Sequence, residues 1–195
     1  MISPDIGGEV ADVTLVRHAM PDELAGPSSH LSHLGPDGRA AARRLAGSLP
    51  RDALVLTSQE PQAVQTAEEI AAACGGEVSV DARVREARRP HRWDERYRER
   101  ARRYVGGQSY VGWEPQEAVV RRFDAGVRAG IEARDGAPLV IVSHGLALTL
   151  WLQSVGAVAD VETFWASLAF PDAWTVGLSP AGATFRAIEL ERIPI

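Results

Sequence analysis

The sequence predicts an α/β fold: a three-layer α/β/α domain with a mainly parallel central sheet. Two observations lead to this prediction. Three short apolar runs have the character of buried strands, and longer segments with helical periodicity lie between them. The length of 195 residues suits one domain with a sizeable core and is short for two, so we expect residues 1–195 to form a single domain.

The predicted central strands are residues 13–16, 53–56 and 139–142. Each run is too short for a typical helix, is rich in valine, isoleucine or leucine, and shows little alternation of apolar and polar side chains. This composition is typical of parallel strands that helices cover on both faces.

The spacing of apolar residues, with proline or glycine near the ends, predicts four helices: residues 35–49, 61–74, 115–133 and 145–155. Alternation of strands and helices in this way favours a parallel sheet flanked by helices. Residues 174–178 and 184–190 are predicted as two later strands, joined by a hairpin-like turn at residues 179–182 that contains proline and glycine.

Charge is distributed unevenly along the chain. Lysine is absent, so all 21 basic residues are arginine, and 26 acidic residues bring the net charge to −5. Residues 83–103 hold ten arginines against four acids, a local charge of +6, which leaves −11 on the rest of the chain. An acidic protein with one basic segment does not fit a general nucleic-acid binder, whereas a small anionic substrate fits it well.

Other classes of protein are also disfavoured. No apolar run reaches the ~18–20 residues that cross a bilayer, so we expect no membrane partner. Residues 1–9 have no basic start followed by an apolar stretch, so we expect no secretory signal and a cytoplasmic protein. The single cysteine, Cys74, excludes an internal disulfide and a cysteine-built zinc site, and its place on an apolar helix stripe predicts burial.

Polar residues follow each of the three predicted central strands. Arg17 and His18 follow the first strand, Ser58 follows the second, and His144 follows the third. Ligands of open α/β sheets bind at the carboxyl ends of the strands, so the two histidines are expected to meet although 126 positions separate them. Helices that begin there direct backbone N–H groups at the same crevice. A cationic pocket of this kind suits a phosphoryl group.

Two other chemistries fit the residues less well. A metal site would need a carboxylate or third histidine at a strand end with ligand-like spacing, and the sequence has none. His30 and His33 lie in a polar loop and are expected to be solvated. A serine hydrolase would need a Gly-x-Ser-x-Gly nucleophile elbow, which is missing.

Five segments in order resemble the motifs of the histidine phosphatase superfamily, in the broad branch that contains cofactor-dependent phosphoglycerate mutases and many small bacterial phosphatases. Residues 15–19, Leu-Val-Arg-His-Ala, are similar to the Arg-His-Gly signature, and residues 140–145, Val-Ile-Val-Ser-His-Gly, to the second-histidine motif. Residues 31–35, 57–67 and 84–86 resemble the Leu-Thr-x-x-Gly segment, the segment after the second strand, and the Leu-x-Glu that carries the acid. The resemblance extends over roughly residues 13–190 and implies a phosphoglycerate mutase-like fold.

This resemblance implies a metal-independent phosphatase that needs no cofactor. His18 would attack phosphorus as a neutral nucleophile and form a phosphohistidine. Arg17 and His144 would bind the phosphate oxygens. Glu86 would protonate the leaving oxygen and then deprotonate the attacking water. Gln62 would complete the phosphate-binding group, and it occupies the position at which the family has a second arginine.

Gln62 departs from the family pattern, in which an arginine follows four residues after the serine that ends the second strand. Losing one charge-assisted donor costs roughly 1.5–3 kcal/mol of binding. Three functions stay open: a phosphatase of a small-molecule phosphomonoester, a repurposed enzyme for a non-phosphate or specialised-metabolite substrate, and a non-catalytic anion-binding domain. In the first case another arginine would compensate, and the candidates are Arg85, Arg88, Arg89 and Arg92.

A basic insertion is predicted at about residues 87–110. If it is helical, pairs such as Glu99–Arg103 lie at ion-pairing distance. It is either a solvated charged helix or a cap that draws anionic substrates into the crevice. In the second case four residues would line the substrate side: His91, Trp93, Tyr97 and Trp113. Taken separately, each aromatic residue is favoured to pack in the core or at the rim. Trp151 and Trp165 lie on apolar stretches and are expected in the core.

Two expectations concern assembly and reaction type. The apolar segment at residues 164–170 offers a contact surface, so a homodimer is left open. The chain passes quickly from Ala19 to Leu31 and lacks the Asn-containing loop with which mutases hold a phosphosugar, so a hydrolase is favoured over a mutase.

Overall fold

The computed structural model describes residues 10–22, 32–90, 95–182 and 184–194. Its strands form one sheet in the order β3-β2-β4-β1-β5-β6. Their bounds are β1 Ala11–Arg17, β2 Leu54–Thr57, β3 Glu77–Val80, β4 Leu139–Ser143, β5 Asp172–Ala181 and β6 Thr184–Arg192. The strands from β3 to β1 pair in parallel, while β5 is antiparallel to both β1 and β6. The prediction of a mainly parallel sheet is therefore confirmed.

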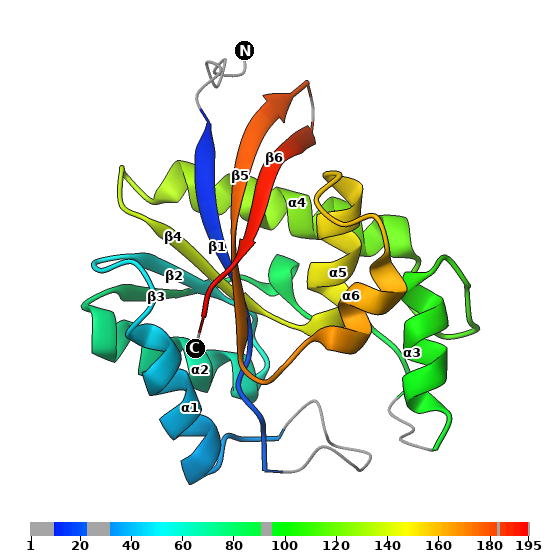
Figure 1. Ribbon diagram of the computed structural model, residues 1–195, viewed down its shortest axis with the longest axis horizontal. Coiled ribbons are helices and arrows are strands. Elements are labelled where there is room, and N and C mark those ends of the chain that lie inside the picture. The colour runs from blue at the N-terminus through cyan, green and yellow to red at the C-terminus, as the bar shows by residue number, and fades with distance from the viewer. Residues whose placement is uncertain (1–9, 23–31, 91–94, 183, 195) are drawn as a thin grey trace.

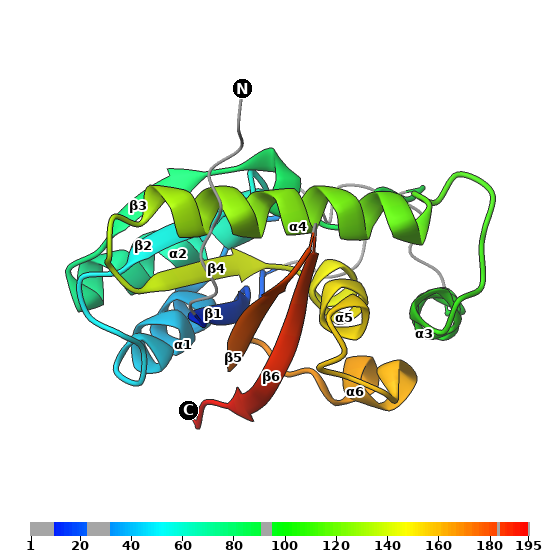
Figure 2. The same cartoon turned by 90° about the horizontal axis from the view of Figure 1, so that it is seen from above.

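Helices cover both faces of this sheet (Figure 1). Their bounds are α1 Pro36–Ala46, α2 Pro61–Cys74, α3 Tyr97–Val105, α4 Gln116–Ala133, α5 Gly145–Ser154 and α6 Val161–Ser167, and a 3₁₀ turn spans Ala82–Val84. Figure 2 shows α4 on one side of the sheet and α1 on the other. This arrangement is the predicted three-layer α/β/α architecture.

The two faces of the sheet carry separate apolar cores. On one face Leu45 of α1 and Ile70 of α2 pack with Val16 of β1, and all three are buried. On the other face Phe123 of α4 packs in a second core with Leu15 of β1. Adjacent residues of β1 thus face opposite cores, which explains why the central strands are apolar without alternation.

The predicted central strands and four helices are present with small shifts at their ends, and Trp151 and Cys74 are buried as predicted. The sequence analysis did not predict β3, because its four residues form an exposed edge strand without an apolar run. The turn predicted at residues 179–182 was wrong in extent, because β5 continues to Ala181. There Pro180 pairs in register with Phe185 of β6.

The basic insertion contains α3, whose predicted ion pair Glu99–Arg103 is present at 2.6 Å. Arg102 also reaches Glu162 of α6 at 2.8 Å, so an ion pair joins α3 to its neighbouring helix. Within the described parts of the chain, no helix combines the length and apolar character needed to span a membrane.

Candidate active site

The ends of β1, β4 and β2 meet at one edge of the sheet. Arg17 is the register partner of Ser143, and the backbone N–H of His18 donates to the carbonyl of Ser143 at 3.0 Å. His18 and His144 therefore lie side by side, with ring centroids 4.9 Å apart and an edge-to-face tilt of 61°. The structure thus brings together the two histidines that lie far apart in the sequence.

A cavity of about 720 Å³ opens at this edge. It is lined by all five residues predicted for the site: Arg17, His18, Gln62, Glu86 and His144. Part of its wall is apolar, formed by Leu146, Leu168 and Phe170. The cavity therefore has room for a phosphoryl group together with a leaving group of moderate size.

His18 has the geometry of a neutral nucleophile. Its Nδ1 lies 2.8 Å from the carbonyl oxygen of Ala19, which can only accept, so Nδ1 carries the proton and Nε2 keeps its lone pair. Burial, together with the nearby His144 and Arg17, lowers the pKa of His18 well below its usual value. The ring is therefore neutral near neutral pH without any further group to deprotonate it.

Arg17 lines the cavity but is partly committed to the protein. Its Nη1 donates to the carbonyls of Leu168 and Ala169 at 2.9 and 3.3 Å, and its guanidinium lies 3.4 Å from the ring centroid of Phe170. Burial lowers the pKa of Arg17 to about 10, so it stays charged near neutral pH. Its Nε has no hydrogen-bonding partner within the described residues. Arg17 is thus held rigidly while part of its donor capacity remains free.

His144 contacts a carboxylate that the sequence analysis missed. Its Nε2 is hydrogen-bonded to Oγ of Ser58 at 2.7 Å and also lies 3.2 Å from Oε2 of Glu60. Burial favours a raised pKa for Glu60, but the neighbouring His144 and Ser58 outweigh it and lower the pKa to about 2. Glu60 also lines the cavity, so a carboxylate stands among the groups expected to bind phosphate. No apolar periodicity or motif marked this residue in the sequence.

Gln62 lies in the first turn of α2 and is 5 % exposed. Its Oε1 has no hydrogen-bonding partner in the described part of the chain. The Thr66 hydroxyl donates to the backbone carbonyl of Gln62 and accepts from the backbone N–H of Ala19. The first turn of α2 is thereby tied to the loop that follows His18.

Glu86 is fixed at the N-terminus of α5. Its Oε1 accepts from the backbone N–H groups of Ala87 and Ala147 at 2.9 and 3.0 Å, and its Oε2 accepts from Leu146 at 3.3 Å. These donors belong to the loop itself and to the first turn of the helix that follows His144. The carboxylate is therefore positioned by backbone groups at the cavity wall.

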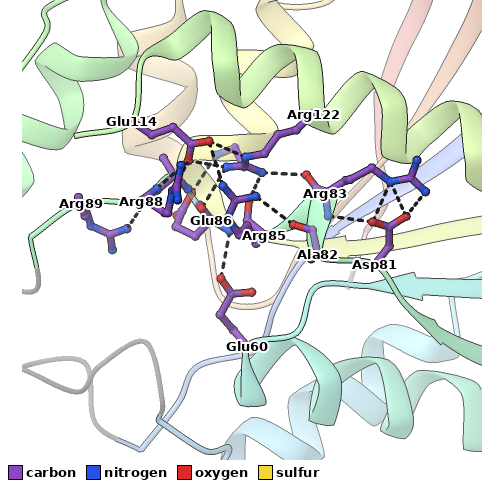
Figure 3. Close-up of polar contacts among 12 residues, drawn as sticks. Glu60, Asp81, Ala82, Arg83, Arg85, Glu86, Arg88, Arg89, Glu114 and Arg122 are labelled. Carbon is purple, nitrogen blue, oxygen red and sulfur yellow. Dashed lines mark hydrogen bonds and ion pairs between the residues drawn. The ribbon is translucent and has the colours of Figure 1, made fainter. Parts of the chain in front are cut away.

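A buried ion-pair network holds the loop that carries Glu86 (Figure 3). Arg122 of α4 donates to the carbonyls of Arg85 and Glu86 at 2.7 and 3.0 Å, and its Nε donates to Glu114 at 2.9 Å. Glu114, whose side chain is 3 % exposed, also accepts from Nη2 of Arg85 and from the backbone N–H of Arg88. The network connects α4 to the loop.

The arginines proposed to compensate for Gln62 have different surroundings. Arg85, Arg88 and Arg89 all line the cavity, and Arg92 lies outside the described residues. Arg85 is bound to Glu114 at 3.1 Å, whereas the Arg88 side chain is 76 % exposed. Arg89 donates to the carbonyl of Ala87 at 3.1 Å and lies over the ring of Tyr97 at 5.1 Å.

The aromatic residues of the insertion divide between cavity and core. Tyr97 lines the cavity, as the cap interpretation predicts, whereas Trp113 is absent from the cavity wall and packs against Tyr97, Tyr104 and Tyr110, which is the packing favoured for each aromatic residue taken separately. His91 and Trp93 lie outside the described residues. Trp165 was predicted in the core but is only partly buried and lines the cavity, because α6 approaches the end of β1.

The remaining histidines do not join the site in the described structure. His33 is exposed and accepts from Nε2 of Gln65 at 2.7 Å, and His30 lies outside the described residues. Within the described ranges, no cluster of three or more histidine, cysteine or acidic side chains has a metal-binding arrangement. The described cavity wall carries two imidazoles, five guanidinium groups and two carboxylates.

Comparison with protein families identifies the superfamily of this chain. The model of the histidine phosphatase superfamily (branch 1) matches residues 13–185, so the chain belongs to this superfamily. Members of the superfamily are usually phosphatases or mutases. No protein of curated function matches the chain at a significant level.

Solved structures share the fold at low sequence identity. A mycobacterial glucosyl-3-phosphoglycerate phosphatase in complex with VO3 is 18% identical, with a TM-score of 0.68 over 91% of this chain and 96% of that chain. A phosphoglycerate mutase from Bacillus anthracis is 15% identical, with a TM-score of 0.68 over 92% of each chain. TTHB049 from Thermus thermophilus is 25% identical, with a TM-score of 0.60 over 94% of this chain and 99% of that chain. These similarities identify the phosphoglycerate mutase-like fold.

Proposed function

We propose that the protein is a metal-independent phosphatase that hydrolyses a small-molecule phosphomonoester through a phosphohistidine on His18. The observation that carries this proposal is the state of His18, a buried neutral ring whose Nδ1 proton is held by the Ala19 carbonyl. This ring lines the same cavity as Glu86, a group able to exchange protons with substrate and water.

In the first step Nε2 of His18 attacks phosphorus in line with the ester bond. The N–P bond forms while the P–O bond breaks, and Glu86 gives its proton to the leaving oxygen. In the second step Glu86 takes a proton from water, the water oxygen attacks phosphorus, and the P–N bond breaks. Inorganic phosphate leaves, and both side chains return to their starting states.

Arg17 and His144 bind the nonbridging oxygens in this proposal, since both line the cavity beside His18. The substrate is a small anionic molecule, because the outer wall of the cavity carries Arg88, Arg89 and Arg98. The fold shared with a glucosyl-3-phosphoglycerate phosphatase is consistent with a phosphorylated metabolite of this size.

Release of phosphate from p-nitrophenyl phosphate tests the proposal. The wild type is expected to turn over, and His18→Ala is expected to be inactive. His33→Ala serves as the matched control, because His33 is an exposed histidine outside the cavity and its loss is expected to leave the rate unchanged. Quenching in alkaline detergent should trap an acid-labile, base-stable phosphoryl group on the wild type. Equal activity of His18→Ala, or trapping on another residue, would contradict the mechanism.

A second function is favoured by the carboxylate of Glu60 beside His144, which weakens the positive field of the cavity. Under this alternative the protein is a repurposed member of the superfamily that acts on a non-phosphate or specialised-metabolite substrate. A broad panel of phosphomonoesters that yields no His18-dependent phosphate release would favour it over the phosphatase.

A further inference from the structure

Glu60 does not act as an ordinary helix cap. It is the N-cap residue of α2, where a short polar side chain usually accepts from the first N–H groups of the helix, yet its side chain makes no such bond. Instead its Oε1 accepts from the backbone N–H of Glu86 at 3.3 Å, and its Oε2 approaches Nε2 of His144 at 3.2 Å. The side chain thus reaches across the cavity between two residues of the proposed mechanism.

The cavity wall carries acceptor side chains at the N-terminus of α2. Among the described residues, Oε1 of Gln62 is buried without a hydrogen-bonding partner, and the buried Oε2 of Glu60 has only the ion-pair contact with Nε2 of His144 at 3.2 Å. The Gln62 side chain belongs to a residue 95 % removed from solvent, at the first turn of α2. Buried acceptors are seldom left unpaired, so the arrangement calls for a ligand that brings a donor as well as negative charge.

A phosphoryl group can carry either one or two negative charges. A monoester loses its second proton near pH 6, roughly as a phosphorylated side chain does. The monoanion keeps one P–OH, which can donate to an unpaired acceptor, while its other nonbridging oxygens accept from Arg17 and His144. The dianion has no donor and places a second negative charge next to the carboxylate of Glu60.

Resting on the proposed function, we propose that Glu60 makes the cavity selective for the singly charged, protonated form of a phosphoryl group over the doubly charged form. The P–OH of the monoanion donates to Oε2 of Glu60, and the dianion is repelled. The protein therefore acts best at pH values below the second ionisation of the phosphomonoester. A cavity with arginine in place of Gln62 would not have this preference. Several other charged or titratable groups surround Glu60: Arg17, His18, Arg85, Glu86 and His144.

Calorimetric binding of inorganic phosphate at about pH 5 and about pH 8.5 tests the proposal, because these values lie on either side of the second phosphate ionisation. The wild type should bind at least roughly tenfold more tightly at the lower pH, as expected for removal of one like charge at close range. Glu60→Gln keeps the shape and every other titratable group, so its ratio should fall toward one. Sulfate, which stays doubly charged at both pH values, should bind Glu60→Gln more tightly than wild type.

Glu69→Gln is the matched control. Glu69 lies on the same helix but outside the cavity, where it pairs with Arg39 and Arg43, so this variant should keep the wild-type ratio. The proposal is overturned if Glu60→Gln keeps the wild-type ratio, if sulfate binds both proteins equally, or if neither protein binds phosphate. Thermal unfolding of both variants verifies that they are folded.

This binding experiment needs no turnover, so it is separate from the test of the proposed function. Charge-selective binding without phosphate release would support the role of Glu60 and contradict the phosphatase. Phosphate release with equal binding of both charge states would support the phosphatase and contradict the role of Glu60. In an active enzyme, kcat/KM for an aryl phosphate should fall above about pH 6 in the wild type and fall less in Glu60→Gln.

Discussion

The cavity has two sides that differ in how far they follow the family pattern. The side formed by the ends of β1 and β4 carries Arg17 and the adjacent rings of His18 and His144. The side formed by the first turn of α2 carries Glu60 and Gln62, where the family pattern has a cationic donor. The neutral state of His18, the proposed nucleophile, depends on one backbone carbonyl and on burial, whereas affinity for an anion depends on the total charge of the cavity. Charge on the α2 side can therefore change while the state of His18 is preserved.

The largest expected effect comes from the side that follows the family pattern. Glu86→Gln removes the proposed proton donor, so kcat should fall about 10²–10⁴-fold. The loss should be much smaller for an aryl phosphate with a very acidic leaving group, because such an oxygen leaves without protonation. Steady-state rates on aryl phosphates of graded leaving-group acidity measure this difference. Glu99→Gln, on the exposed face of α3, is the control and should change neither rate.

The next largest effect is expected on stability, in the ion-pair network that holds the loop of Glu86. Glu114→Ala leaves Arg85 and Arg122 partly buried without their shared carboxylate, so the free energy of unfolding should drop by about 3–5 kcal/mol. Denaturant unfolding measures this drop. Glu69→Ala removes a surface carboxylate with two arginine partners and should cost below about 1 kcal/mol. Equal losses of unfolding free energy in the two variants would mean that the buried network stabilises the protein no more than a pair of surface contacts does.

The difference between the two sides also explains what the sequence could predict. The central strands were recognisable because burial on both faces makes residues such as Leu15 and Val16 apolar without alternation. The meeting of His18 and His144 followed from the parallel register of β1 and β4. Glu60 was not recognisable, because no motif marks a glutamate at this position, and only the tertiary structure brings its side chain to His144 and to the backbone of Glu86.

Restoring positive charge on the α2 side should have an effect of intermediate size on phosphate binding. Gln62→Arg adds a charge-assisted donor worth roughly 1.5–3 kcal/mol, so dianionic phosphate should bind about 10–100-fold more tightly near pH 8. Product inhibition by phosphate provides the measurement. Gln62→Leu, which changes the side chain without adding charge, should show no such gain. A rise in affinity in both variants would point to space rather than charge as the limit.

The smallest expected effect concerns the ring that covers Arg17. The Phe170 ring lies against the Arg17 guanidinium and 5.3 Å from the ring of His18. Phe170→Leu removes a cation–π contact worth about 0.5–1 kcal/mol, so KM should rise about two- to fivefold while kcat stays nearly constant. Phe164→Leu is the control, because Phe164 packs against Trp174 outside the cavity wall. A fall in KM on replacing Phe170 would mean that the ring obstructs Arg17 rather than orders it, and the anion affinity of this side would then depend on access as well as on charge.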